Sequence, residues 1–272
     1  MILDRADVER LGVAEGSALG FEEAPKPDGA GVGLRVLRVA GEPRFELSHW
    51  CGTCPFLFER LPAEGKLPVP ESAFAERLRT GLPAIDREVV ESFARLLPEG
   101  EYIPILLDVT PQLVEPGGER DYFAHEQLDT YWGPAQDPQT PYYRTFEAPV
   151  GEEAHLYEFV VPMVPPSWND PLGVESYADR DSSGLLPTAV AVSILDVTAP
   201  AMDQGADWYW HWTLTHFLLD GHHKFEAAAR AGAPVRLLSL VATRDGLSTP
   251  DEVSTALNVR NKAASARRAR RA

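Results

Sequence analysis

Three apolar runs in the last third of the chain restrict the fold more than any other feature of the sequence. They cover residues 186–197, 212–219 and 235–243, and each has the length of a buried strand. Between the second and third runs, Phe225 to Ala231 has helical spacing, and Gly232 follows it as a C-terminal stop. Strands that alternate with a helix predict an α/β core.

The first half of the chain predicts an α+β region. Residues 33–40 and 44–50 are β-prone runs at hairpin spacing, and residues 86–97 carry an apolar stripe of helical period with Asp86 as N-cap. From these patterns we expect four parts. They are a flexible leader at 1–30, an α+β region at 31–150, a second domain at 151–246 and a basic C-terminal tail at 247–272.

Composition excludes some classes of protein. The 272 residues are 44% hydrophobic and 24% charged, which is ordinary for a globular chain. No apolar run approaches the ~20 residues that span a bilayer, and charged residues interrupt the N-terminal segment, so it is not a signal peptide. We therefore predict a cytoplasmic protein without a membrane partner.

Charge is distributed unevenly along the chain. The formal net charge of -16 argues against a protein that coats nucleic acid, because such binding needs a basic face. The end of the chain differs, since residues 258–272 hold six basic residues and no acid. This segment is interpreted either as a solvated end or as a tether to RNA or another acidic partner.

The turn after the second apolar run has the chemistry of a phosphate site. Gly221 precedes the predicted helix, and a helix start without a side chain in the way offers free N–H groups to an anion. Lys224 adds a cation, while His222 and His223 add donors that can move protons near neutral pH. Asp220 could orient a histidine, hold Mg²⁺ or act as a base. The other interpretation is an ordinary strand-to-helix turn with surface histidines.

Residues 217–229, FLLDGHHKFEAAA, resemble the signature of the ParB/sulfiredoxin superfamily, and the resemblance extends over about residues 155–245. In that superfamily a strand, a Gly-x-His-Arg-like turn and an alanine-rich helix bind nucleotide phosphates within a mixed sheet. The resemblance implies ATP or ADP with Mg²⁺ as cofactor, with Asp220 as a candidate Mg²⁺ ligand. The nucleotide would lie against Gly221, His222, His223 and Lys224. One departure is Lys224, because the superfamily usually has Arg there, and Lys binds phosphate only as a point charge.

Members of this superfamily include a CTP-binding DNA-segregation protein, an ATP-dependent sulfinic acid reductase and kinases of free serine. The acidic chain disfavours the first, and His222 stands where the reductase has its cysteine. We therefore expect an ATP- or ADP-dependent kinase that phosphorylates a small hydroxylated metabolite such as an amino acid. Its expected catalytic residues are Asp220, His222, His223 and Glu175, the last placed by its resemblance to an acid of the serine kinases. The alternative is a nucleotide-gated binding or regulatory protein without catalysis.

A second motif is formed by Cys51 and Cys54. Residues 50–54, WCGTC, resemble a thioredoxin-type site, in which a helix N-terminus lowers the pKa of the first thiol. A thiol oxidoreductase is therefore a further alternative. The same pair could contribute to a zinc site, although a single CxxC leaves the zinc tetrahedron incomplete, or the two cysteines could only pack or pair with each other.

Overall fold

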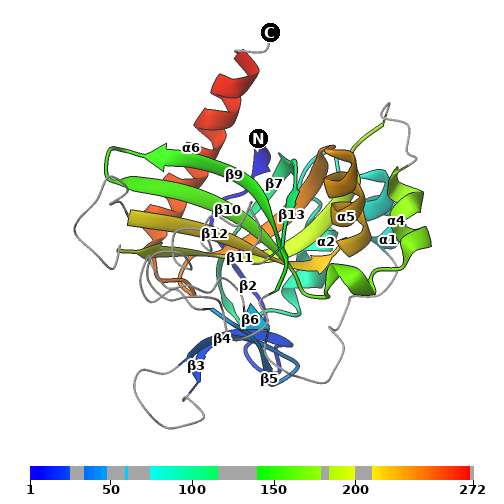
Figure 1. The fold of residues 1–272 in the computed structure, drawn as a ribbon. Helices are drawn as coiled ribbons and strands as arrows, with labels where there is room; N and C mark the ends of the chain where they lie inside the picture. The colour runs from blue at the N-terminus through cyan, green and yellow to red at the C-terminus, as the bar shows by residue number, and fades with distance from the viewer. Residues whose placement is uncertain are drawn as a thin grey trace.

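The computed structural model of the chain describes residues 1–24, 34–47, 59–60, 74–115, 140–178, 184–199 and 210–269. Within these ranges the chain forms one large sheet, one small sheet below it and α-helices around the large sheet (Figure 1). No helix in the described ranges is long and apolar enough to cross a membrane.

The large sheet has nine strands and is mixed. Its order is β1-β7-β13-β11-β12-β10-β9-β8, and β2 also pairs with β7. The pairs β10/β12 and β11/β13 are parallel, whereas the other pairs are antiparallel. Strands and helices in this arrangement confirm the α/β class. The strands are β1 (Ile2–Arg5), β2 (Glu9–Leu11), β7 (Gly100–Val109), β8 (Gln112–Val114), β9 (Tyr142–Val150), β10 (Ala154–Pro162), β11 (Thr188–Thr198), β12 (Trp210–Asp220) and β13 (Val235–Ala242).

The small sheet and the helices complete the described fold. The small sheet has the order β3-β4-β5-β6, with β3 (Leu19–Ala24), β4 (Leu34–Val39), β5 (Glu42–Glu46) and β6 (Glu59–Arg60). The helices are α1 (Ala75–Thr80), α2 (Arg87–Ala94), α4 (Pro171–Ala178), α5 (His222–Ala231) and α6 (Pro250–Ala269), with a 3₁₀ turn, η3 (Pro166–Trp168).

Most elements predicted from the sequence are confirmed. The three apolar runs form β11, β12 and β13, and the helix between the last two is α5, which ends at Gly232. The hairpin expected at 33–50 is β4 and β5. Asp86 caps α2, because its carboxylate accepts hydrogen bonds from the N–H groups of Glu88 and Val89.

The expected division of the chain differs from the structure in three places. Residues 1–24 contain β1, β2 and β3, which pair with β7 and β4, where a flexible leader was expected. The boundary expected at residue 150 lies at the end of β9, within the β9–β10 hairpin. In addition, β7 of the expected part 31–150 pairs with β13 of the expected part 151–246, so these two parts share one sheet. The expected tail contains α6. The partners of β1, β2 and β7 are remote in sequence, so local patterns could not reveal these pairings.

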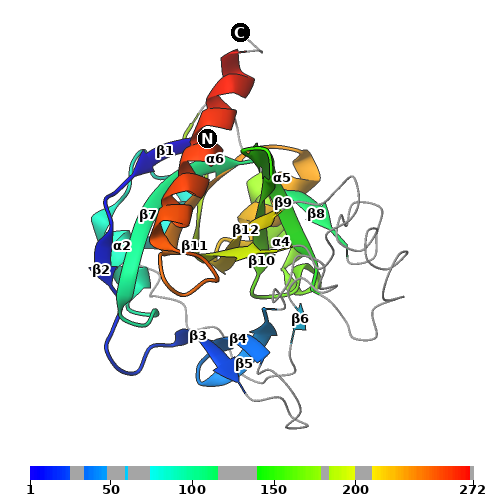
Figure 2. The same ribbon diagram turned by 90° about the vertical axis from the view of Figure 1, so that its left-hand side faces the viewer.

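Two apolar cores lie on opposite faces of the large sheet. Alternate residues of a strand point to opposite faces, and on β11 Val192 joins one core whereas Ala191 joins the other. The first core includes buried residues of the small sheet, α1 and α2. The second includes Phe225 of α5 and Leu257 of α6. Figure 2 shows α6 between β1 and β9, and Arg5 of β1 donates a hydrogen bond to Asn258 of α6.

A buried ion pair joins the small sheet to the large one. The guanidinium of Arg35 on β4 donates two hydrogen bonds to the carboxylate of Asp196 on β11, at 3.0 and 2.8 Å. Both side chains are buried, and the same carboxylate accepts a bond from the N–H of Leu247. Two parallel bonds fix the relative orientation of the two groups, so this pair sets how β4 lies against β11.

We predict that Arg35→Ala lowers the free energy of unfolding by about 3–5 kcal/mol, because it leaves the Asp196 carboxylate buried without its cation. The control is Arg38→Ala on the same strand, whose pair with Glu22 is partly exposed and should cost less than about 1 kcal/mol. Urea denaturation monitored by tryptophan fluorescence measures both. Equal losses for the two variants would contradict the assignment of this link to Arg35 and Asp196.

Candidate ligand-binding site

The turn between β12 and α5 is shaped by a close approach of two backbones. Gly221 is the N-cap of α5 and has φ of 96°, in the left-handed region. A Cβ atom at this position would lie 2.6 Å from the Cβ of Ala189 on β11, which is closer than van der Waals contact permits. Glycine is therefore required here by the backbone conformation and by packing against β11, before any ligand is considered.

Lys224 connects the first turn of α5 to the sheet. Its Nζ donates hydrogen bonds to the carbonyl oxygen of Thr188 at 2.8 Å and to Oδ2 of Asp220 at 3.1 Å. The residue is only 6% exposed, whereas the Asp220 side chain is 31% exposed. The ammonium thus has two fixed oxygen partners, and the carboxylate that balances its charge still contacts solvent.

The second histidine of the turn contacts α4. Nε2 of His223 accepts a hydrogen bond from the backbone N–H of Asp170 at 3.1 Å, and a Cβ built at Gly173 would lie 3.2 Å from the same ring. One turn further along α5, Glu226 accepts a bond from the side-chain amide of Asn169 at 2.5 Å. These contacts fix the N-terminal end of α4 against α5.

A pocket of about 500 Å³ lies between α5, the C-terminal end of α4 and the segments before β11 and β13. We name it the α5 pocket. Among the lining residues that the structure describes, the polar side chains are Lys224, Thr80 and Tyr177, and the others are apolar or glycine. These other residues are Ala178, Gly184, Leu185, Leu186, Pro187, Ala227, Ala228, Ala231, Ala233, Pro234 and Val235. Its size is within the range of small-molecule sites, about 300–1,000 Å³.

The structure brings only part of the predicted site into this pocket. Of the predicted residues, Lys224 lines it, whereas Asp220, Gly221, His222 and His223 are not among its lining residues in the described part of the chain. Glu175, expected in a loop, lies exposed on α4, whose Tyr177 and Ala178 line the pocket.

Two further predicted sites receive no support from the described residues. Cys51 and Cys54 lie outside them, so the predicted redox or zinc pair is not described. Within the described ranges, no group of three or more His, Cys, Asp or Glu side chains could hold a metal ion.

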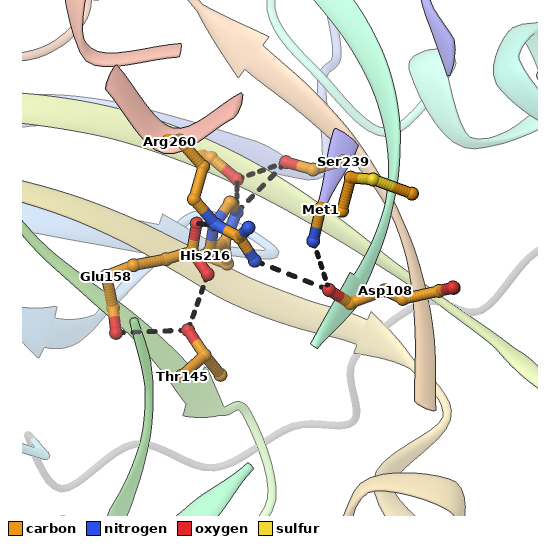
Figure 3. A network of polar contacts seen from close by, with 8 residues as sticks. Met1, Asp108, Thr145, Glu158, His216, Ser239 and Arg260 are labelled. Carbon is orange, nitrogen blue, oxygen red and sulfur yellow. Dashed lines mark hydrogen bonds and ion pairs between the residues drawn. The ribbon is translucent and has the colours of Figure 1, made fainter. Parts of the chain in front are cut away.

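A second polar cluster lies inside the core under α6 (Figure 3). Glu158 of β10, His216 of β12, Ser193 of β11 and Ser239 of β13 are all fully buried. Nδ1 of His216 lies 2.6 Å from the Ser193 hydroxyl, and its Nε2 lies 3.9 Å from Glu158. Both serine hydroxyls also contact each other. We call these four residues, with Arg260, the buried polar cluster.

Arg260 of α6 supplies the positive charge of this cluster. Its Nε donates to Oε2 of Glu158 at 2.7 Å, and its guanidinium lies over the ring of Phe146 at 4.6 Å. Thr145 of β9 donates to Oε1 of the same carboxylate at 2.7 Å. Burial alone would raise the pKa of Glu158, but Arg260 and His216 outweigh burial and hold that pKa well below its ordinary value.

Serine, histidine and glutamate in contact are the residue types of a hydrolytic triad, but this cluster is closed to solvent. The Ser193 hydroxyl faces Nδ1 of His216, whereas the serine of a triad faces Nε2 of its histidine. The Glu158 carboxylate is bound to Arg260 and Thr145. The geometry therefore indicates a structural role, in which the cluster attaches α6 to β10 and β12.

Sequence reasoning missed the buried polar cluster and most of the pocket lining. The available signal for the cluster was an isolated Glu158 and an isolated His216 within apolar strands. Arg260 was grouped with the basic tail, although it is buried. Nothing in the sequence indicated that Thr80 and Tyr177 line a pocket, because the pocket is formed by segments that are remote in sequence.

Comparison of the chain with protein-family models, with curated proteins and with solved structures gave no match. The site must therefore be interpreted from its own chemistry.

We predict that Gly221→Ala lowers the free energy of unfolding by about 3 kcal/mol, because the new methyl group meets Ala189 and the residue is strained at positive φ. The matched control is Gly232→Ala at the other end of α5. Gly232 also has positive φ, but its Cβ would have open space, so the cost should be about 1 kcal/mol. Thermal and urea unfolding compare the two; a Gly221 variant as stable as the Gly232 variant would refute the close-approach argument.

The lowered pKa of Glu158 predicts a specific pH dependence. A carboxylate whose folded pKa is lowered stabilises the fold above its unfolded pKa of about 4.3, and this contribution is lost as pH falls through the folded pKa. Glu158→Gln should therefore destabilise the protein by about 3 kcal/mol at pH 7, and the difference from the unmodified chain should shrink below about pH 4.

Glu99→Gln is the control, because Glu99 forms an exposed pair with Arg10 and its replacement should leave stability nearly unchanged. Urea unfolding at several pH values between 3 and 7 measures the effect. A Glu158→Gln deficit that stays constant across this range would show that the carboxylate charge is not what stabilises the cluster.

Proposed function

We propose that this chain binds a small phosphorylated molecule with an apolar or planar body in the α5 pocket, and that a nucleotide is this ligand. The observation that carries the proposal is the lining of the pocket: among the described residues that form it, Lys224 is the one charged side chain, and the others are neutral and mostly apolar. Few precisely placed polar groups on an apolar lining are typical of small-molecule sites.

The distribution of groups in the pocket suggests how the ligand would lie. Ala227, Ala228 and Ala231 recur on one side of α5 and offer a flat apolar surface for a planar body. Lys224 lies one turn nearer the start of the helix, where an anion is favoured by the helix dipole. The phosphate end would therefore point toward Lys224, with the Tyr177 side chain as a further polar group of the wall.

More specifically, we propose that the nucleotide site is of the ParB/sulfiredoxin type. The order of β12, the Gly221 turn, α5 and β13 supports it, because the superfamily motif needs a strand, a turn, a helix and a strand in this sequence. Gly221, His222 and His223 would then lie near the phosphates. Mg²⁺ would neutralise phosphate charge next to the partly exposed carboxylate of Asp220, which matters in a chain of net charge -16.

We further propose that the chain is a kinase that transfers phosphate from the bound nucleotide. A kinase needs positive charge over the transferred phosphoryl group and a base near the acceptor hydroxyl. Lys224 supplies the first, and Asp220, His222, His223 and Glu175 are the residues proposed for acid–base work. Glu175 is exposed on α4, one helical turn before Ala178 of the pocket wall. A regulator that binds the same nucleotide without transfer is the alternative.

We predict that ATP or ADP at 1 mM with Mg²⁺ raises the melting temperature by about 5 °C, since saturation of a site a hundred-fold above its Kd adds about 2.7 kcal/mol. Ala231→Trp should abolish this shift, because Ala231 is exposed at the pocket rim and an indole there fills the space. Arg230→Trp is the matched control. It places the same side chain on the neighbouring exposed residue, which does not line the pocket.

Differential scanning fluorimetry with ATP, ADP, CTP and GTP measures the shift. No stabilisation by any of the four, or an equal shift in Ala231→Trp, would remove the nucleotide proposal. Release of ADP from ATP in the presence of an amino-acid panel then separates the kinase from the regulator. A nucleotide shift without turnover on any acceptor would favour the regulator.

A further inference from the structure

Helix α6 has two halves that lie in different surroundings. In the first half, Leu257 belongs to the core on this face of the large sheet, and Arg260 is buried against Glu158. Lys262, two residues later, is exposed. In Figures 1 and 2 the helix continues past β1 and β9, and its C-terminal end lies away from both sheets. We name residues 261–269, which form this projecting end, the α6 arm.

The α6 arm is basic, whereas the rest of the chain is acidic. Because the whole chain carries a formal charge of -16 and residues 261–272 carry +5, residues 1–260 carry -21. The charge of Arg260 is balanced by Glu158 and does not belong to the arm. From residue 261 to the end, the sequence has no acidic residue, and its basic residues are Lys262, Arg267, Arg268, Arg270 and Arg271.

The other residues of the arm exclude two kinds of partner. They are Asn261, Ser265 and alanines, so the arm has no apolar side chain larger than a methyl group. A helix that lies on a lipid surface or in the groove of another protein needs large apolar residues along one face. Charge is therefore the property by which the α6 arm can recognise a partner, and the partner must be a polyanion.

The position of the arm separates such a partner from the acidic part of the chain. A helix rises by about 1.5 Å per residue, so Arg268 lies about 12 Å further along α6 than Arg260. At physiological ionic strength, salt screens exposed charges over about 8 Å. A polyanion bound at the end of the arm is thus largely screened from the negative charge of residues 1–260.

Nucleic acid fits the arm better than the acidic surface of a second copy of the chain. Several exposed glutamates already pair with arginines of their own chain, such as Glu99 with Arg10 and Glu101 with Arg244. A further exposed ion pair between two copies would add at most about 1 kcal/mol. Nucleic acid instead offers phosphates in a continuous row, and each phosphate that is neutralised releases bound counterions.

We propose that the α6 arm binds the phosphate backbone of double-stranded DNA. An α-helix with its side chains is about 10–12 Å wide, which matches the major groove of B-DNA at about 12 Å, whereas the major groove of double-stranded RNA is too narrow. Arginine binds phosphate through paired hydrogen bonds. Because these contacts are to phosphate, binding is independent of base sequence. It is also independent of the α5 pocket and of the proposed function.

Fluorescence anisotropy with a labelled DNA duplex tests the proposal on the full chain. If the arm neutralises about four phosphates, a rise in salt from about 50 to 200 mM should weaken binding about a hundredfold. A double-stranded RNA of the same length should bind about tenfold more weakly than the DNA.

Three double variants assign binding to the arm. Arg267→Ala/Arg268→Ala should weaken binding about tenfold at low salt and reduce the slope of log affinity against log salt by about 2. Arg267→Lys/Arg268→Lys keeps the charge and should retain most of the binding. The matched control is Arg10→Ala/Arg87→Ala, which removes the same charge from exposed arginines of β2 and α2 and should leave binding unchanged. The melting temperature of each arm variant should equal that of the unmodified chain.

Absence of duplex binding at low salt, equal affinity in Arg267→Ala/Arg268→Ala, or an equal loss in the control overturns the proposal. Tighter binding to the RNA duplex overturns DNA as the ligand. Self-association in analytical ultracentrifugation at low salt that is lost in Arg267→Ala/Arg268→Ala, without DNA binding, would assign the arm to a second copy of the chain instead. Ala231→Trp, which fills the α5 pocket, should bind DNA normally, so failure of the nucleotide proposal and failure of the DNA proposal are distinguishable.

Discussion

The buried carboxylate of Glu158 is the constraint on which the arrangement of one whole face of the large sheet depends. An uncompensated charge in the core costs several kcal/mol, so the fold must bring a cation to it. Arg260 meets this need from α6, and Thr145 adds a hydrogen bond from β9. Because Arg260 reaches Glu158 only from α6, this requirement fixes α6 across the sheet, between β1 and β9 (Figure 2).

A second constraint acts on the other helix of the same face. The close approach of Gly221 to Ala189 determines how near the start of α5 lies to β11. At this distance the Lys224 ammonium reaches the carbonyl oxygen of Thr188, and the alanine side of α5 faces the segment before β11 across the α5 pocket. From the sequence, Gly221 was interpreted as part of a phosphate site, but in the structure it is required for packing against Ala189. The pocket that it helps to create lies along the helix rather than at its first N–H groups.

The net charge of the chain affects which ligands the α5 pocket can bind. An acidic chain repels anions in general, so an anionic ligand must meet a local cation in surroundings of low dielectric, where a single charge acts strongly. Lys224 provides this charge, and Asp220 balances it when no ligand is bound. The same pair supports electrostatic binding of a phosphate.

The sequence by itself determined the local elements: the α/β class, α2 with its Asp86 cap, and the succession β12, Gly221 turn, α5 and β13. These depend on periodicity, caps and glycine positions over fewer than about 20 neighbouring residues. Only the tertiary structure decided which of the motif residues lines a pocket, and that Arg260 is a core residue rather than part of a solvated tail. The physical reason is separation in sequence. Glu158 and Arg260 are 102 residues apart, and Thr188 and Lys224 are 36 apart, so their contacts follow from strand pairing and burial that no local pattern encodes.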